Sequence, residues 1–299
     1  MSNAEPKPGL VLGTAQLGTG YGINNSVIQN ETECINLLRC AWENGVRALD
    51  TAEGYGPSES MIGAYHQNYP GDIFSICTKL PGSIDPKSLA THLRESLNKM
   101  NVDTIDIYYM HSFATCKEPE SIEVLESLRS TGLVDKIGVS IYEPFELRFI
   151  LDNLCEVVTV IQIPFSVFDC ARWINEGLLQ EAKTRGISLF ARSVYLQGTV
   201  FKELNDPILE ELGLNAAMLE LEKLACSLNV SRAQLALDFV KDTSEISAVI
   251  LGSETAKQVE SNVRMMSNDS QWSSEARQNM IAISAALDER AVDPRKWHV

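Results

Sequence analysis

The sequence has no apolar run that approaches the ~20 residues of a membrane-spanning helix. The start of the chain also lacks the apolar segment of a secretory signal peptide. Basic residues are few: 25 Lys and Arg stand against 40 Asp and Glu, which gives a net charge of -15. This charge disfavours a polyanionic partner such as nucleic acid or an anionic membrane surface. We therefore expect a cytoplasmic protein that binds no nucleic acid and no membrane, in which any phosphate site is local.

Paired cysteine motifs and domain linkers are missing too. The seven cysteines are scattered and odd in number, and none has CxxC spacing, which is typical of thiols that stay reduced. No Gly/Ser-rich or Pro-rich stretch divides the chain, so we expect one domain over residues 1–299, with residues 1–8 as a flexible amino terminus. Residues 13–18, after the first apolar run, do not form the GxGxxG dinucleotide-binding fingerprint.

The sequence does contain eight short apolar runs, each followed by a segment with helical spacing. Strands buried on both faces are typical of parallel sheets, so this alternation predicts an α/β fold, a closed (β/α)8 TIM barrel. A doubly wound open sheet is the alternative. The predicted strands are 10–13, 46–50, 73–79, 105–111, 136–140, 158–163, 187–192 and 246–251. The predicted helices are 31–44, 86–100, 121–131, 144–153, 175–185, 216–228, 231–241, 255–266 and 273–287, with another that starts near a capping serine, Ser58.

Three consecutive predicted strands end in side chains that suit proton transfer. The second ends in Asp50, the third in Lys79 and the fourth in His111, while Tyr55 lies in the loop after the second. Because the carboxyl ends of barrel strands form one rim, these four side chains should converge. A lysine ammonium lowers the pKa of a nearby phenol. Tyr55 is thus a candidate general acid that protonates a carbonyl oxygen as a hydride arrives at carbon.

Other chemistries use part of the same set. One Asp and one His beside a lysine make a poor ligand set, so we predict no metal site. A lyase or aldolase that forms a Schiff base on Lys79 would need a lysine with a depressed pKa. Asp50 opposes that reading, because it keeps the amine protonated.

Several stretches resemble the aldo-keto reductase superfamily over nearly the whole chain. They are Leu-Asp-Thr-Ala-Glu-Gly-Tyr-Gly (49–56), Thr-Lys-Leu (78–80), Tyr-Tyr-Met-His-Ser (108–112), Ile-Gly-Val-Ser (137–140), Ile-Gln-Ile-Pro-Phe (161–165) and Gly-Ser-x-Thr (252–255). The resemblance implies an oxidoreductase that reduces an aldehyde or ketone with NADPH, NADH not being excluded. It also implies the catalytic tetrad Asp50, Tyr55, Lys79 and His111, with Tyr55 as the proton donor.

The resemblance also assigns cofactor contacts. Ser140 and Gln162 would contact the nicotinamide carboxamide, and Arg192 would replace the aromatic residue that stacks on the nicotinamide in many members. The pyrophosphate would lie at the loop after the seventh strand, and the adenosine end at the helix after the eighth. The residues of these two regions are Ser193, Leu196 and Gly198, followed by Gly252, Ser253, Thr255, Gln258 and Asn262.

The chain departs from the family pattern at the cofactor site. Ile141 stands where an asparagine often follows the serine of the fifth strand. Gly252 and Gln258 stand where a lysine and an arginine often clamp the adenosine 2′-phosphate. The expected preference for NADPH therefore comes from the family and not from these residues.

Loops set the substrate in this fold, and they are the least readable part of the sequence. Tyr21, Phe113, residues 199–214 and the tail 296–299 are candidates for the substrate wall. Residues 13–25 and 192–198 resemble a bacterial branch of the family associated with polysaccharide biosynthesis, which suggests a small carbonyl substrate such as a sugar. A cofactor-binding redox sensor of the same fold, with little turnover, is the alternative function.

Overall fold

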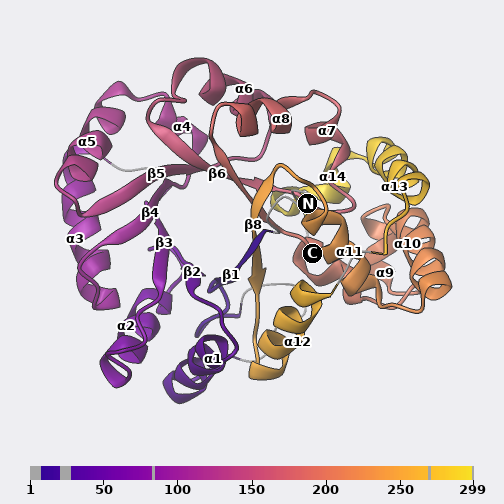
Figure 1. The fold of residues 1–299 in the computed structure, drawn as a ribbon, viewed down its shortest axis with the longest axis horizontal. Coiled ribbons are helices and arrows are strands. Elements are labelled where there is room, and N and C mark those ends of the chain that lie inside the picture. Colours follow the sequence, from indigo (N-terminus) through magenta and orange to yellow (C-terminus); the bar gives the residue numbers. More distant parts are fainter. Residues whose placement is uncertain (1–7, 21–27, 83–84, 269–270, 298–299) are drawn as a thin grey trace, which may run out of the picture.

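The computed structural model describes residues 8–20, 28–82, 85–268 and 271–297. Eight parallel strands follow one another around a closed barrel, and the last strand pairs with the first (Figure 1). The predicted TIM barrel is thereby confirmed. The strands are β1 (Gly9–Gly13), β2 (Ala48–Asp50), β3 (Ser75–Lys79), β4 (Ile105–Met110), β5 (Val134–Ser140), β6 (Val158–Pro164), β7 (Ser188–Arg192) and β8 (Ile246–Gly252).

Burial on both faces explains why these runs form strands. In β6, six of the seven residues are buried, including Ile161 and Ile163, because alternate side chains face the barrel interior and the surrounding helices. Each predicted strand matches an observed one to within two residues at either end.

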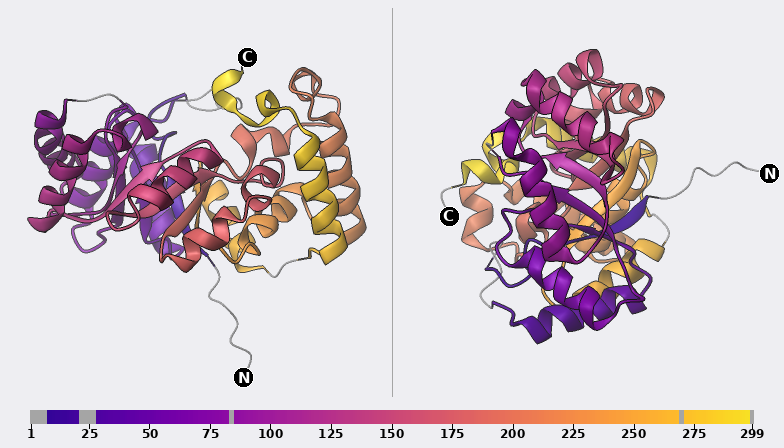
Figure 2. Two further views of the ribbon diagram at one scale, coloured as in Figure 1. Left: turned by 90° about the horizontal axis from the view of Figure 1, so that it is seen from above. Right: turned by 90° about the vertical axis from the view of Figure 1, so that its left-hand side faces the viewer.

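Helices surround the barrel (Figure 1). The longer ones are α1 (Glu31–Glu43), α2 (Ser58–Asn68), α3 (Leu89–Met100), α5 (Pro119–Ser130), α6 (Pro144–Asn153), α8 (Leu178–Thr184), α10 (Asn215–Leu228), α11 (Arg232–Lys241), α12 (Ala256–Ser267) and α13 (Ser274–Ala286). Short helical turns are α4 (Phe113–Cys116), α7 (Ala171–Ile174), α9 (Pro207–Glu211), α14 (Glu289–Val292), η1 (Pro86–Ser88), η2 (Leu196–Phe201) and η3 (Pro294–Lys296). Figure 2 shows α10 and α13, which pack together, at one end of the molecule.

Two helix predictions need correction. The helix expected over 175–185 is shorter, because Gly177 adopts a left-handed φ of 68° and α8 starts only after it. Ser58 is the first residue of α2 and does not cap it; Pro57 holds the N-cap position. The Ser58 hydroxyl instead donates to Thr14 Oγ1 at 2.8 Å, which joins α2 to the loop after β1.

Some sequence predictions fall outside the described residues. These are residues 1–7 of the expected flexible amino terminus, the candidate wall residue Tyr21, and the last two residues of the tail, 298–299. Within the described part of the chain, no helix is both long and apolar enough to cross a membrane.

Candidate active site

The four predicted catalytic side chains lie together at the carboxyl end of the barrel. Asp50 and Lys79 are the last residues of β2 and β3, and His111 directly follows β4. Tyr55 sits in the turn before α2, where its amide donates to Ala52 O at 3.0 Å. Gly56 continues this turn with a φ of 55°, a conformation that suits glycine. The strand ends and one tight turn therefore bring the four groups to one place.

A buried ion pair forms the base of the site. Lys79 Nζ lies 2.6 Å from Asp50 Oδ2 and also donates to Thr51 O at 2.8 Å. Only 2% of Lys79 and 5% of Asp50 is exposed to solvent. Burial by itself lowers the pKa of Lys79, but the Asp50 carboxylate and the Tyr55 phenol outweigh it, so the pKa is raised above its usual value. Lys79 is therefore an ammonium at neutral pH.

The tyrosine and the histidine lie above this pair. Lys79 Nζ is 5.1 Å from the centre of the Tyr55 ring. The Tyr55 and His111 rings meet edge to face, with centroids 6.2 Å apart. Burial, together with the charges of Lys79 and Arg192, lowers the pKa of His111 to about 4. Its imidazole is therefore neutral at pH 7 and has one N–H to donate.

Gln162 has a contact that the sequence did not reveal. Its Nε2 donates to Asp50 Oδ1, so Asp50 is held by Gln162 on one oxygen and by Lys79 on the other. Gln162 Oε1 is buried and has no hydrogen-bond partner among the described residues. Ser140 pairs with Gln162 in the β5–β6 register. The site thus offers a buried amide acceptor beside Ser140, with the Tyr109 phenol also close to the Gln162 side chain.

A second unforeseen contact supports the Tyr55 loop from outside. His92 on α3 has its Nδ1 2.9 Å from each carboxylate oxygen of Glu53, two residues before Tyr55. The Glu53 amide donates to Lys79 O at 3.3 Å. A histidine far along the sequence gave no signal of this role, because only the fold brings it to the loop.

Arg192 ends β7 and lies over a neighbouring aromatic ring. Its Cζ is 4.1 Å from the centre of the Tyr142 ring, and its Nη2 donates to Ile141 O at 3.0 Å. The expected stacking on a nicotinamide would therefore add to, or replace, a contact that the protein already makes. Tyr142 is a further site residue that sequence reasoning missed.

The loop after β7 carries unusual backbone conformations. Ser193, Leu196, Gln197 and Gly198 all have positive φ, at 60°, 44°, 56° and 90°. Such strain in non-glycine residues is costly and tends to gather at functional sites. The amides of Leu196 and Gly198, expected near a pyrophosphate, already donate within the loop to Ser193 O and Tyr195 O.

The start of α12 is held by its own side chains. Thr255 caps the helix by accepting from the Gln258 amide at 3.3 Å, and Gln258 Oε1 accepts from the Glu254 amide at 2.6 Å. Buried Asn262 donates to Ser253 Oγ at 3.1 Å. The side chains of Gln258 and Asn262, expected at the adenine end, thus shape this helix start.

Glycine at position 252 lets a side chain pack closely against the end of β8. A Cβ there would lie 2.5 Å from the side chain of Gln16. Gln16 belongs to the loop after β1, so Gly252 allows the first and last loops of the barrel to meet at the rim.

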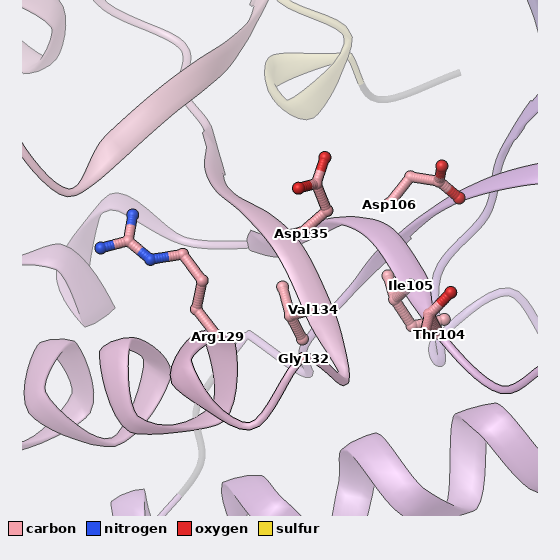
Figure 3. A pocket seen from close by; sticks show the side chains of 7 residues that line it. All are labelled: Thr104, Ile105, Asp106, Arg129, Gly132, Val134 and Asp135. Atoms are coloured by element: carbon pink, nitrogen blue, oxygen red, sulfur yellow. The ribbon is translucent and has the colours of Figure 1, made fainter.

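A pocket at the other end of the barrel is shown in Figure 3. It has a volume of about 360 Å³ and is lined at the amino ends of β4 and β5. Its polar side chains are Thr104, Asp106, Arg129 and Asp135. None of the proposed catalytic groups belongs to it, so it is separate from the active site.

Comparisons with known proteins bear on the family and the fold of this chain. The model of the "Aldo/keto reductase family" matches residues 9–279. L-glyceraldehyde 3-phosphate reductase of Escherichia coli is 24% identical over 303 residues, which cover 88% of this chain and 86% of the relative. NADH-specific methylglyoxal reductase of E. coli is 27% identical over 212 residues, 62% of this chain and 63% of the relative. An aldo-keto reductase from Bacillus halodurans, in its holo form, superposes with a TM-score of 0.74 at 22% identity, covering 95% of each chain.

Proposed function

The chain belongs to the aldo/keto reductase family, and from this premise we propose that it reduces an aldehyde or ketone with a nicotinamide cofactor, Tyr55 being the proton donor. Family membership supports an oxidoreductase that acts on carbonyl compounds. The observation that carries the finer proposal is the buried Lys79, paired with Asp50 and 5.1 Å from the centre of the Tyr55 ring.

The cofactor proposal is supported by the surroundings of Gln162. Its buried Oε1, which has no partner among the described residues, suits the N–H of a primary amide such as the nicotinamide carboxamide. Ser140, beside it in the sheet, would add a hydroxyl. When bound, a reduced nicotinamide would supply the hydride. We propose NADPH as the cofactor, with NADH as the form to compare, since one relative is named for NADH.

The protein side chains would manage the proton and the developing charge. The Lys79 ammonium favours ionisation of the Tyr55 phenol, which makes Tyr55 a better acid towards a carbonyl oxygen. The neutral His111 would donate its N–H to the same oxygen. Asp50 would keep Lys79 charged and in place. A Schiff-base role for Lys79 is disfavoured, because a raised pKa leaves little free amine.

The substrate proposal is a small carbonyl compound, such as a sugar or sugar-derived aldehyde. Two relatives are named for glyceraldehyde 3-phosphate and methylglyoxal. Phe113, at the start of α4 and two residues after His111, packs edge to face on exposed Phe145 at a centroid distance of 5.9 Å. This aromatic pair would supply an apolar part of the substrate wall.

Oxidation of NADPH and NADH should be followed at 340 nm with a panel of carbonyls that includes both of these compounds and free sugars. We expect turnover that falls on the order of 10²–10⁴-fold in Tyr55→Phe, as for loss of a general acid. Cofactor fluorescence titration would show that the variant still binds. Tight cofactor binding with no turnover on any carbonyl would support a redox sensor instead. Borohydride trapping on Lys79 without nicotinamide binding would support a lyase.

A further inference from the structure

The last described turn of the chain packs on the loop that follows β5. Arg295, in η3, has its Cζ 3.5 Å from the centre of the Tyr142 ring. Arg192, from the end of β7, has its Cζ 4.1 Å from the centre of the same ring. Both distances are well within the range of cation–π contacts. One aromatic ring therefore connects the tail of the chain to the rim of the active site.

Arg295 is fixed by carboxylates on both sides of this contact. Its Nη2 lies 2.6 Å from Asp293 Oδ2 and 3.4 Å from Glu143 Oε1. Burial by itself raises the pKa of Asp293, but hydrogen bonds from Arg295 outweigh it and the pKa is lowered. Arg172 also pairs with Glu143, at 2.7 Å. The tail is thus tied by a network of charges, which holds geometry better than an isolated surface pair.

Arg192 has no comparable anchor. No carboxylate among the residues that the structure describes lies within ion-pair distance of it, and its Nε is buried without a hydrogen-bond partner in that part of the chain. Its defined contacts are Ile141 O, a long one to Ser193 Oγ at 3.5 Å, and the Tyr142 ring. An arginine side chain has many rotamers to lose, so its place depends strongly on Tyr142.

We propose that Arg295 is a positioning residue: by packing on Tyr142 it fixes that ring and thereby holds the Arg192 guanidinium at the mouth of the active site. The tail of the chain then becomes part of the machinery that places the Arg192 charge near His111 at the rim of the site. This inference rests on the proposed function in one respect: it assumes that a substrate and a cofactor bind at the end of the barrel where Arg192 lies.

His111 provides a local probe of where the Arg192 charge lies. The charged and titratable groups around it are Lys79, Asp50, Tyr55 and Arg192. If Arg192 moves away while Lys79, Asp50 and Tyr55 stay, one positive charge that disfavours protonation of His111 is lost. The His111 pKa should then rise from its lowered value. This readout needs no catalysis.

The test uses the full-length protein with Arg295→Ala and Arg295→Lys. Tyr142→Leu removes the ring, whereas Tyr142→Phe keeps it. Lys296→Ala is the matched control. Lys296 pairs with Glu289 and lies 3.9 Å from Asp293 Oδ2, so it belongs to the same charge network, but it is not one of the two cations over Tyr142. Each variant would be measured for KM and kcat on the best carbonyl, and for the His111 pKa by NMR titration, with His111→Asn for assignment.

We expect Arg295→Ala and Tyr142→Leu to raise KM about five-fold, the scale of one partly buried cation–π contact, with kcat changed less. Both should raise the His111 pKa. Arg295→Lys should fall between Arg295→Ala and wild type. Tyr142→Phe should change KM less than Tyr142→Leu, because it keeps the ring, and Lys296→Ala should match wild type. Thermal unfolding of each variant separates this local effect from a loss of fold.

Two outcomes would overturn the inference. One is wild-type KM and His111 titration in both Arg295→Ala and Tyr142→Leu. The other is an equal loss in Lys296→Ala, which would show general damage to the tail. If the wild-type protein turns over no carbonyl, the proposed function fails, and the His111 titration still decides the positioning role.

Discussion

Lys79 Nζ lies 2.6 Å from Asp50 Oδ2, and both residues are almost wholly removed from solvent. Taking two charges out of water costs several kcal/mol for each ion, and their attraction repays this only when the remaining hydrogen bonds are also made. Two of them are made: Gln162 donates to the second Asp50 oxygen and Thr51 O accepts from Lys79. These contacts offset part of the cost of burying the pair, and they hold both charged groups in place at the carboxyl end of the barrel.

We predict that Asp50→Asn destabilises the fold by roughly 3–5 kcal/mol, because it leaves the Lys79 ammonium buried without its counter-ion. Urea unfolding at pH 7 measures this change in the free energy of unfolding. Lys79→Met and the double variant Asp50→Asn/Lys79→Met complete the cycle. The double variant should be more stable than the sum of the two single losses predicts, since no lone charge remains. Additive losses would show that the two side chains do not interact as described.

His111 should make folding stability depend on pH. Burial and the nearby cations lower the pKa of His111 to about 4 in the folded protein. A histidine in the unfolded chain has a pKa of about 6.5. Between these values the unfolded state binds more protons, so stability is full above about pH 6.5 and decreases as the pH falls towards 4. Comparing the free energy of unfolding at pH 7 and 4.5 measures the loss.

His111→Gln is the control for this pH effect, because it removes the titrating group and keeps a side chain that can donate. Its stability should decline less than that of the wild type between pH 7 and 4.5. An identical decline in both proteins would place the sensitivity elsewhere, for example in His66, whose pKa burial also lowers.

The sequence predicted the barrel and its rim well because both rest on local patterns. Apolar runs mark strands that are buried on both faces, and a polar residue at the end of such a run, such as Lys79, must lie at the rim. The links between distant segments were not predictable in this way. The hydrogen bond from Gln162 to Asp50 and the contact of His92 with Glu53 are two examples. Both depend on which strands and helices become neighbours in the folded chain.

The misplaced helix cap and the unforeseen contacts of Gln162 and Tyr142 have the same origin. Ser58 follows Pro57 and has the side chain of a capping residue, but its hydroxyl bonds to Thr14, 44 positions away. The hydrogen bond from Gln162 to Asp50 was not foreseen, because a single sequence does not show that Asp50 lies within reach of Gln162. Tyr142 carries no motif, and its contact with Arg295 spans more than half of the chain.

Gly138→Ala should be destabilising by about 1–3 kcal/mol, the usual cost of overpacking a core. A Cβ at this position would lie 2.5 Å from two ring carbons of Tyr109, a buried residue of β4. The ring also lies below the site, with Lys79 Nζ 5.9 Å from its centre. Gly71→Ala is the matched control, because no atom lies within 4 Å of its added Cβ. Thermal unfolding of both variants checks this; equal melting temperatures would show that Tyr109 has room to move.

Gln258→Arg should improve NADPH binding and leave NADH binding almost unchanged. Gln258 lies in the first turn of α12, where the family resemblance places the adenosine 2′-phosphate and where this chain has an uncharged side chain. A guanidinium there adds a charge-assisted hydrogen bond to a phosphate, worth about 1.5–3 kcal/mol, or roughly ten-fold or more in Kd. Fluorescence titration with the two cofactors measures the ratio of their dissociation constants.

Gln258→Met is the control, since it removes the hydrogen bond to the Glu254 amide without adding charge. An equal gain for NADH and NADPH would mean that the 2′-phosphate does not reach this helix, and the proposed orientation of the cofactor would have to be abandoned.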